Sequence, residues 1–231
     1  MNLCCALLRI LIVTGASDEP YHHWRETTAC IREGLERTGK FDVRVVEEPR
    51  GITAAALERY DAVLLNYNGP RFPVEAEAAI EAFVRSGHGF AAFHQAAYGA
   101  FFGMEFRDRK WRAGPTAGWT AYARMIGATW EPEKIGHARR GKFQVDFKDG
   151  RPSFTADDEL YHRLTLDPGV QVLADAMSAV TGNREPLIWT NRYGNGRVFF
   201  TTLGHDNTAW AQPGLMDALV RGLEMIHAQE R

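Results

Sequence analysis

The chain has 231 residues, of which 45% are hydrophobic and 24% are charged, and its formal net charge is −2. This length and composition predict a single globular α/β domain spanning residues 1–231, with a core large enough to need no disulfides. The weakly negative charge argues against a nucleic-acid partner, and no apolar stretch is long enough to cross a membrane. Three cysteines, with no C-x-x-C pair, argue against a disulfide scaffold and favour a cytoplasmic protein.

Strands and helices alternate along most of the chain. Apolar runs rich in β-branched residues predict strands at 9–14, 41–46, 62–66, 89–94, 143–147, 170–176, 186–190 and 198–202. Apolar residues at helical spacing predict helices at 24–38, 73–87, 122–126 and 215–226. We therefore expect a flavodoxin-like, mainly parallel sheet with helices on both faces, extended by mixed strands in the C-terminal part.

Unusual polar residues follow several of these strands. In open α/β sheets, ligands bind beyond the carboxyl ends of the strands. The residues found there are His22, His23 and Trp24, then Asn66 and Asn68, then His94 and Gln95, and finally His205 and Asp206. Because parallel strands end at the same edge of a sheet, we expect these side chains to converge on one crevice.

Each of these residues also has a purely structural interpretation. Either His22 or His23 is then a surface residue near a helix start, and His94 is a buried core histidine. The two asparagines are turn formers before a Gly-Pro pair. Asp206 is the N-cap of a helix.

A second polar stretch, TADDELYHRL, carries Asp158 and Glu159. Two acids in succession are equally typical of the first turn of a helix, where the helix dipole favours negative charge. Tryptophans such as Trp189 are more often core residues than platforms for a sugar ring.

Several of these stretches together resemble the ThuA-like family, which is named for trehalose utilisation. The matching stretches are, in chain order, ILIVTG, YHHWRETT, YDAVLLNYNG, GFAAFH, GWTAYARMIGATW, an FQV strand preceded by His137, DELY at 158–161, and EPLIWTNRYGNGRVFFTTLGHD at 185–206. They span nearly the whole chain in the expected order, and the last two are the most specific. The resemblance implies a flavodoxin-like fold related to the class I glutamine amidotransferases.

The resemblance also bears on chemistry. True amidotransferases carry a cysteine at the sharp turn after a central strand, whereas GFAAFHQAA places His94 at the analogous position. Glutamine hydrolysis through a thiolate is therefore the weakest hypothesis for this chain. The family is associated with disaccharide catabolism beside dehydrogenases that make 3-oxo sugars, which implies a sugar or a 3-oxo-glycoside as substrate.

Our first hypothesis is a carbohydrate-catabolic lyase, isomerase or hydrolase. A carbonyl at C3 acidifies the neighbouring C–H, so a base can remove that proton while an acid protonates a departing glycosidic oxygen. The catalytic candidates are His94, His205 and Glu159, with Asp206 orienting an imidazole. The candidate substrate-binding residues are His22, His23, Trp24, Asn66, Asn68, Gln95, His137, Asp158, Tyr161 and Trp189.

Two further hypotheses stay open at this point. In one, His22 or His23 joins His94, His205 and a carboxylate to hold a divalent metal such as zinc, which polarises the sugar carbonyl. In the other, the crevice binds a carbohydrate without catalysis and the protein is a binding or regulatory module. No nucleotide cofactor is expected, and the sequence leaves a homo-oligomer open.

Overall fold

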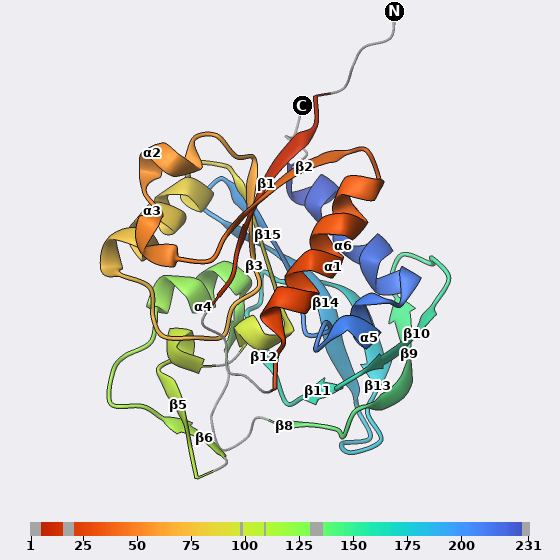
Figure 1. Cartoon of the computed structure of the whole chain (residues 1–231). Helices are drawn as coiled ribbons and strands as arrows, with labels where there is room; N and C mark the ends of the chain where they lie inside the picture. The colour runs from red at the N-terminus through yellow and green to blue at the C-terminus, as the bar shows by residue number, and fades with distance from the viewer. Residues whose placement is uncertain (1–5, 16–20, 98, 109, 130–135, 228–231) are drawn as a thin grey trace, which may run out of the picture.

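The computed structural model describes residues 6–15, 21–97, 99–108, 110–129 and 136–227, and these residues form one nine-stranded sheet with helices on both faces (Figure 1). The strands of this sheet are β1 (Leu8–Val13), β2 (Phe41–Val46), β3 (Ala62–Leu65), β4 (Gly89–Phe93), β9 (Gly141–Phe147), β10 (Phe154–Asp158), β13 (Gln171–Met177), β14 (Arg184–Tyr193) and β15 (Gly196–Thr201). The helices are α1 (Trp24–Arg37), α2 (Ala54–Leu57), α3 (Val74–Arg85), α4 (Thr120–Ile126), α5 (Asn207–Trp210) and α6 (Pro213–His227).

The sheet has a parallel half and an antiparallel half. The parallel half has the spatial order β2-β1-β3-β4-β15, and the antiparallel half continues from β15 as β14-β13-β9-β10. The parallel order reverses between β1 and β3, as in flavodoxin-like folds, where ligands bind at this switch point. The expected fold class, with mixed strands added in the C-terminal part, is confirmed.

Short paired strands and 3₁₀ helices lie outside the main sheet, in the segments that connect its strands. The paired short strands are β5 (Met104–Arg107) with β6 (Lys110–Ala113), β7 (Ala128–Thr129) with β12 (Thr165–Leu166), and β8 (Gly136–His137) with β11 (Tyr161–His162). The 3₁₀ helices are η1 (Pro49–Gly51), η2 (His94–Ala97) and η3 (Gly99–Phe102). Between β4 and β9 the described residues therefore form small strands and 3₁₀ turns besides α4.

Strand β10 corrects one structural alternative drawn from the sequence. Asp158 is its last residue, and Glu159 lies in the turn before β11, so the two acids do not start a helix. The segment becomes a strand because β10 pairs antiparallel with β9, which places Phe154 opposite Val145. Cross-strand pairing of this kind is invisible to a pattern that is read along one segment.

Two hydrophobic cores lie on the two faces of the sheet. One face is covered by α1, α5 and α6, whose side chains, such as Ile31 and Leu223, pack on β1, β3 and β15. Helices α2, α3 and α4 cover the other face, where Ile80 and Tyr122 pack against Phe90 and its neighbours. Each fully buried side chain of this size stabilises the fold by about 1.5–3 kcal/mol.

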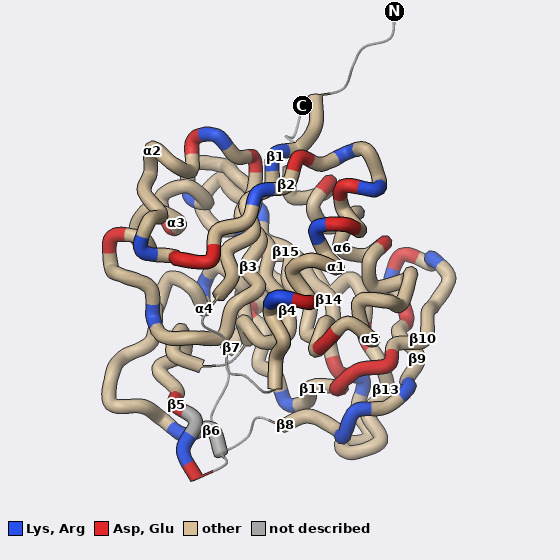
Figure 2. The backbone as a smooth tube through the Cα atoms, in the orientation of Figure 1, with Lys and Arg blue, Asp and Glu red and all other residues tan. Residues whose placement is uncertain are grey.

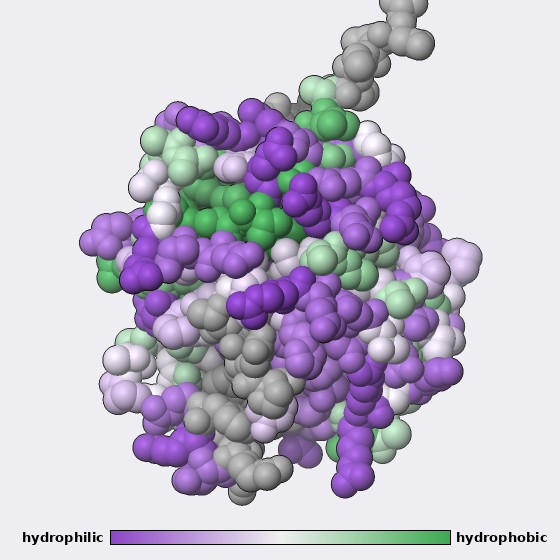
Figure 3. All heavy atoms as spheres, in the orientation of Figure 1, coloured by the Kyte–Doolittle hydropathy of each residue, from purple (hydrophilic) through white to green (hydrophobic). Residues whose placement is uncertain are grey.

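Figure 2 shows that Lys and Arg positions are interspersed with Asp and Glu positions along the backbone. A recessed apolar area in Figure 3 lies near α2. A pocket of about 390 Å³ is found there, lined by Leu11, Val46, Ile52, Leu57 and Tyr60 among others, and none of its lining residues is a candidate site residue. Within the described residues, no helix has the length and apolar character needed to cross a membrane.

Candidate functional site

His94 stands at the end of the central strand β4 in an unusual backbone conformation. Its φ angle is +37°, in the left-handed region that non-glycine residues rarely adopt. Such strain costs about 1–3 kcal/mol and persists only where surrounding structure holds it. The sharp turn expected from the amidotransferase comparison is therefore present, and it presents an imidazole.

The contacts of His94 determine which of its ring nitrogens carries the hydrogen. Its Nδ1 lies 2.8 Å from the carbonyl oxygen of Thr202, at the end of β15. Because a carbonyl only accepts hydrogen bonds, Nδ1 carries the hydrogen, and Nε2 offers its lone pair. That Nε2 lies 3.0 Å from Nδ1 of His205 and 3.3 Å from the hydroxyl oxygen of Tyr161.

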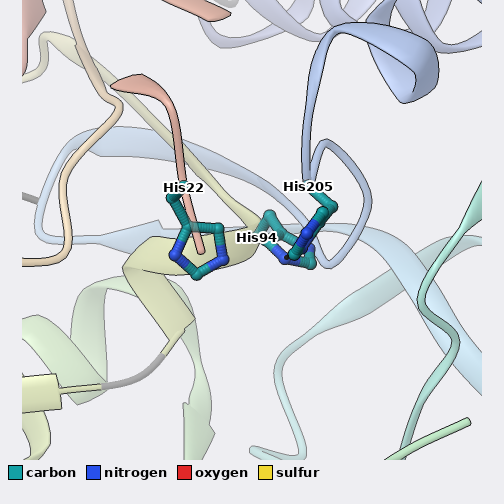
Figure 4. A group of neighbouring side chains, drawn as sticks. All are labelled: His22, His94 and His205. Carbon is teal, nitrogen blue, oxygen red and sulfur yellow. Dashed lines mark hydrogen bonds between the residues drawn. The ribbon is translucent and has the colours of Figure 1, made fainter. Parts of the chain in front are cut away.

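Three histidines from separate parts of the chain meet at this point (Figure 4). His22 precedes α1, His94 ends β4, and His205 lies between β15 and α5. Their ring centroids are 4.9 to 5.2 Å apart, with each pair of rings close to edge-on. One nitrogen of each ring lies within 4.8 Å of the others. The sequence prediction that these strand ends converge is borne out for these three side chains.

Glu159 joins the cluster from the turn after β10. Its carboxylate oxygens lie 3.5 Å from Nδ1 of His205, 3.8 Å from Nε2 of His94 and 3.5 Å from Nδ1 of His137. Tyr161 follows on β11, where it pairs with His137 across a short two-stranded sheet. The cluster therefore combines imidazoles, one carboxylate and one phenol around a shared space.

The pKa values of the clustered groups are shifted in different directions. Complete burial lowers the pKa of His94 well below its ordinary range, and the nearby His22 and His205 lower it further. Burial by itself disfavours the charged forms of Glu159 and His205. The hydrogen bond and charge attraction between Glu159 and His205 outweigh this effect of burial. The pKa of Glu159 is therefore lowered, and that of His205 is raised. These shifts favour the neutral form of His94 and the charged forms of Glu159 and His205.

Asp158 is buried next to the cluster, where it supports the site but cannot contact a ligand. Its carboxylate is buried and accepts hydrogen bonds from the backbone N–H of Gly204 at 2.6 Å and of Glu159 at 2.7 Å. It thereby ties the loop that carries His205 to the turn that carries Glu159. Burial raises the pKa of Asp158 to about 7, although the two N–H donors favour its charged form.

Asn66 and Gln95 form a second buried layer. The side-chain amide of Asn66 donates to the hydroxyls of Thr27 at 3.0 Å and Thr28 at 2.8 Å, and its oxygen accepts from Gln95. These bonds fasten the start of α1, next to His22, to the ends of β3 and β4. Both were expected to touch substrate. The structure instead buries them completely in an internal network, and Asn68 is buried two residues further on.

Three other candidates, His23, Trp24 and Trp189, lie outside the cluster. His23 is exposed at the N-cap of α1, and the buried ring of Trp24 is covered by the guanidinium of Arg25 at 4.1 Å. Trp189 was expected to bind sugar, and the structure corrects this placement. Its ring is fully buried against Phe200, and its indole N–H donates to the carbonyl of Ile126 at 2.7 Å.

Asp206 is confirmed as a helix N-cap. One oxygen accepts from the backbone N–H groups of Thr208 and Ala209 at the start of α5, and its carboxylate pairs with Arg140. It holds the chain directly after His205 but does not bond to the imidazole. Sequence analysis did not single out Arg140, which also pairs with Asp157. Nothing in the local sequence signals this long-range pairing.

Comparisons with known proteins agree with this architecture. A family profile described as trehalose utilisation, ThuA, matches residues 9–226. A ThuA-like protein from Parabacteroides merdae is 24% identical, with 98% of this chain and 93% of that chain covered and a TM-score of 0.73. A second, from Bacteroides uniformis, is 17% identical over 98% and 94% of the two chains, with a TM-score of 0.71.

A protein described as cytoplasmic, from Salmonella typhimurium LT2, has 14% identity, covers 95% of this chain and 99% of its own, and gives a TM-score of 0.61. These likenesses, all under 25% identity, carry the fold. A search of curated proteins found no match to the sequence.

Proposed function

Since the chain belongs to the ThuA, or trehalose-utilisation, family, we propose that it is a carbohydrate-catabolic enzyme that acts on a 3-oxo-glycoside by acid–base chemistry. The small-molecule substrate is a disaccharide or glycoside whose C3 hydroxyl has been oxidised to a carbonyl. We place the reaction in the cytoplasm, which agrees with the Salmonella protein of similar fold.

One observation carries this proposal. His94, His205, Glu159 and Tyr161 come from distant parts of the chain and meet within hydrogen-bonding or near-contact distance at the carboxyl edge of the sheet. Several of these groups are largely buried, and a structural core has no use for a carboxylate among imidazoles. Titratable groups gathered in this way are typical of sites for proton transfer.

The groups suit an elimination. Glu159 takes the proton from C2, the C–H electron pair forms the C2–C3 double bond of an enolate, and the oxygen at C3 receives the negative charge. The histidine cluster stabilises that oxygen. Collapse of the enolate reforms the carbonyl and makes a C1–C2 double bond while the C1–O glycosidic bond breaks. The departing oxygen takes a proton from Tyr161 or His205, so an alcohol and an unsaturated 3-oxo sugar are formed.

Proton NMR in deuterium oxide tests the proposal. We expect no change in trehalose, and in its 3-oxo derivative both release of glucose and exchange of the C2 hydrogen for deuterium. Glu159→Gln should slow both processes by about 10²–10⁴-fold, the usual contribution of a general base. Glu33→Gln, at an exposed position of α1, is the matched control and should behave as wild type.

Two outcomes would count against this reading. Equal exchange rates in wild type and Glu159→Gln would remove Glu159 as the base. Selective line broadening of a sugar, with neither exchange nor product, would favour the non-catalytic binding module instead.

A further inference from the structure

The three histidines are arranged as a donor set as well as an acid–base cluster. His22, His94 and His205 each aim one nitrogen into a common space, and these nitrogens lie within 4.8 Å of one another. Figure 4 shows that the rings reach this space from three unconnected segments. The hydrogen bond between His94 and His205 joins two of these rings, and His22 brings a third nitrogen to the same space.

The support behind the ring of His94 is typical of a metal ligand. A metal-bound histidine almost always donates its other ring N–H to a carbonyl or carboxylate, which fixes the tautomer and the ring orientation. His94 meets this condition, because its Nδ1 donates to Thr202 and leaves Nε2 facing the cluster. His205 is held at both flanks, by the bond from Gly204 to Asp158 and by the cap that Asp206 provides.

The spacing is close to that of a tetrahedral site. Zinc–nitrogen bonds of about 2.0–2.1 Å place neighbouring ligand nitrogens roughly 3.4 Å apart. Nε2 of His94 and Nδ1 of His205 are 3.0 Å apart, so they need to separate by only a few tenths of an ångström. The three nitrogens lie within 4.8 Å of one another, so His22 must approach the other two by up to about 1.4 Å.

We propose that His22, His94 and His205 form a three-histidine site for a divalent transition-metal ion of the zinc class, with its open coordination position facing Glu159 and Tyr161. Imidazole ligands suit zinc and its transition-metal neighbours, whereas magnesium and calcium prefer oxygen ligands. Glu159 lies 3.5 Å and 3.8 Å from two of the ligand nitrogens, which is near enough to bond to an oxygen held at the open position.

Ion binding itself is independent of the proposed function, but its use in the reaction rests on it. A carbonyl oxygen at the open position would be polarised by the ion as Lewis acid, in the place where an imidazolium proton would otherwise act. Glu159 keeps its task as proton acceptor from the neighbouring carbon. The metal therefore deepens the proposed chemistry without changing which bonds form and break.

Metal binding is measured on the full chain after dialysis against EDTA. We expect ZnCl₂ to bind with a stoichiometry of one ion per chain in isothermal titration calorimetry, with MgCl₂ giving no saturable binding. His22→Ala and His205→Ala should each weaken zinc binding at least about 100-fold, because two ligands remain of three. His23→Ala, the adjacent exposed histidine, should bind as wild type.

Two further measurements distinguish the loss of a metal ligand from misfolding of the variant. Zinc should raise the melting temperature of wild type and His23→Ala, and leave that of His22→Ala unchanged, with all apo proteins melting at similar temperatures. Binding of CoCl₂ should give the visible bands of four-coordinate cobalt in wild type and lose them in His205→Ala.

Two results would overturn the proposal: no saturable zinc binding by wild type, or zinc binding by His22→Ala and His205→Ala with wild-type affinity. The metal proposal and the proposed function fail separately. Turnover of the 3-oxo-glycoside that survives EDTA would remove the ion from the reaction but keep the enzyme. Zinc binding without turnover of any 3-oxo-glycoside would keep the site and refute the proposed substrate.

Discussion

Asp158→Asn is expected to flatten the dependence of folding stability on pH. The side chain is buried, with 1% of its surface exposed, and burial raises its pKa from 3.8 to about 7. A raised folded-state pKa means that the folded protein binds a proton that the unfolded chain has released. The stabilisation from this proton is fully present below about pH 4 and is lost as the pH rises through 7.

The magnitude follows from the shift. Each pKa unit corresponds to about 1.4 kcal/mol, so between pH 5 and pH 8 this one group costs wild type about 3 kcal/mol of unfolding free energy. Asparagine does not titrate, so the variant lacks this slope. It also leaves one of the two backbone N–H groups without an acceptor, which lowers its stability at every pH by about 1–3 kcal/mol.

Urea unfolding in EDTA at pH 5, 6, 7 and 8 measures both effects. The unfolding free energy of wild type minus that of Asp158→Asn should fall by about 3 kcal/mol from pH 5 to pH 8, which brings it to about zero or below. Asp157→Asn, one residue earlier and partly exposed, should run parallel to wild type. Parallel curves for Asp158→Asn would mean that the two N–H donors keep the carboxylate ionised throughout, and would refute the burial argument.

Two further predictions separate packing from binding. Trp189→Phe should lower the free energy of unfolding, measured in urea, by about 1–3 kcal/mol, because the carbonyl of Ile126 loses its donor. The apparent affinity for any sugar should stay unchanged, and a weakened affinity would contradict the core placement of Trp189. Asn66→Ala should lower the free energy of unfolding by at least about 2 kcal/mol in the same assay. It should also raise KM more than it lowers kcat, since the bonds from Asn66 to Thr27 and Thr28 position the loop before α1. Stability equal to wild type would show that this network does not stabilise the fold.

The site divides into parts that sequence patterns can predict and parts that they cannot. His94 and His205 were predictable because each directly follows a buried apolar run, and parallel strands bring such positions to one edge. The choice between His22 and His23 was not predictable, because it depends on the rotation of the chain at the start of α1. Glu159 was identified through its tetrapeptide, but its local structure was ambiguous between strand and helix.

The sequence by itself determined most of the long strands and helices, because the period of apolar residues reflects local backbone geometry and one-sided burial. It also determined that polar residues cluster after the strands. Only the tertiary structure decided that Trp189 is core, that Asn66 and Gln95 bond to each other, and that Arg140 reaches Asp206. These outcomes depend on contacts between residues far apart in the chain, whose energies have no signature in any local pattern.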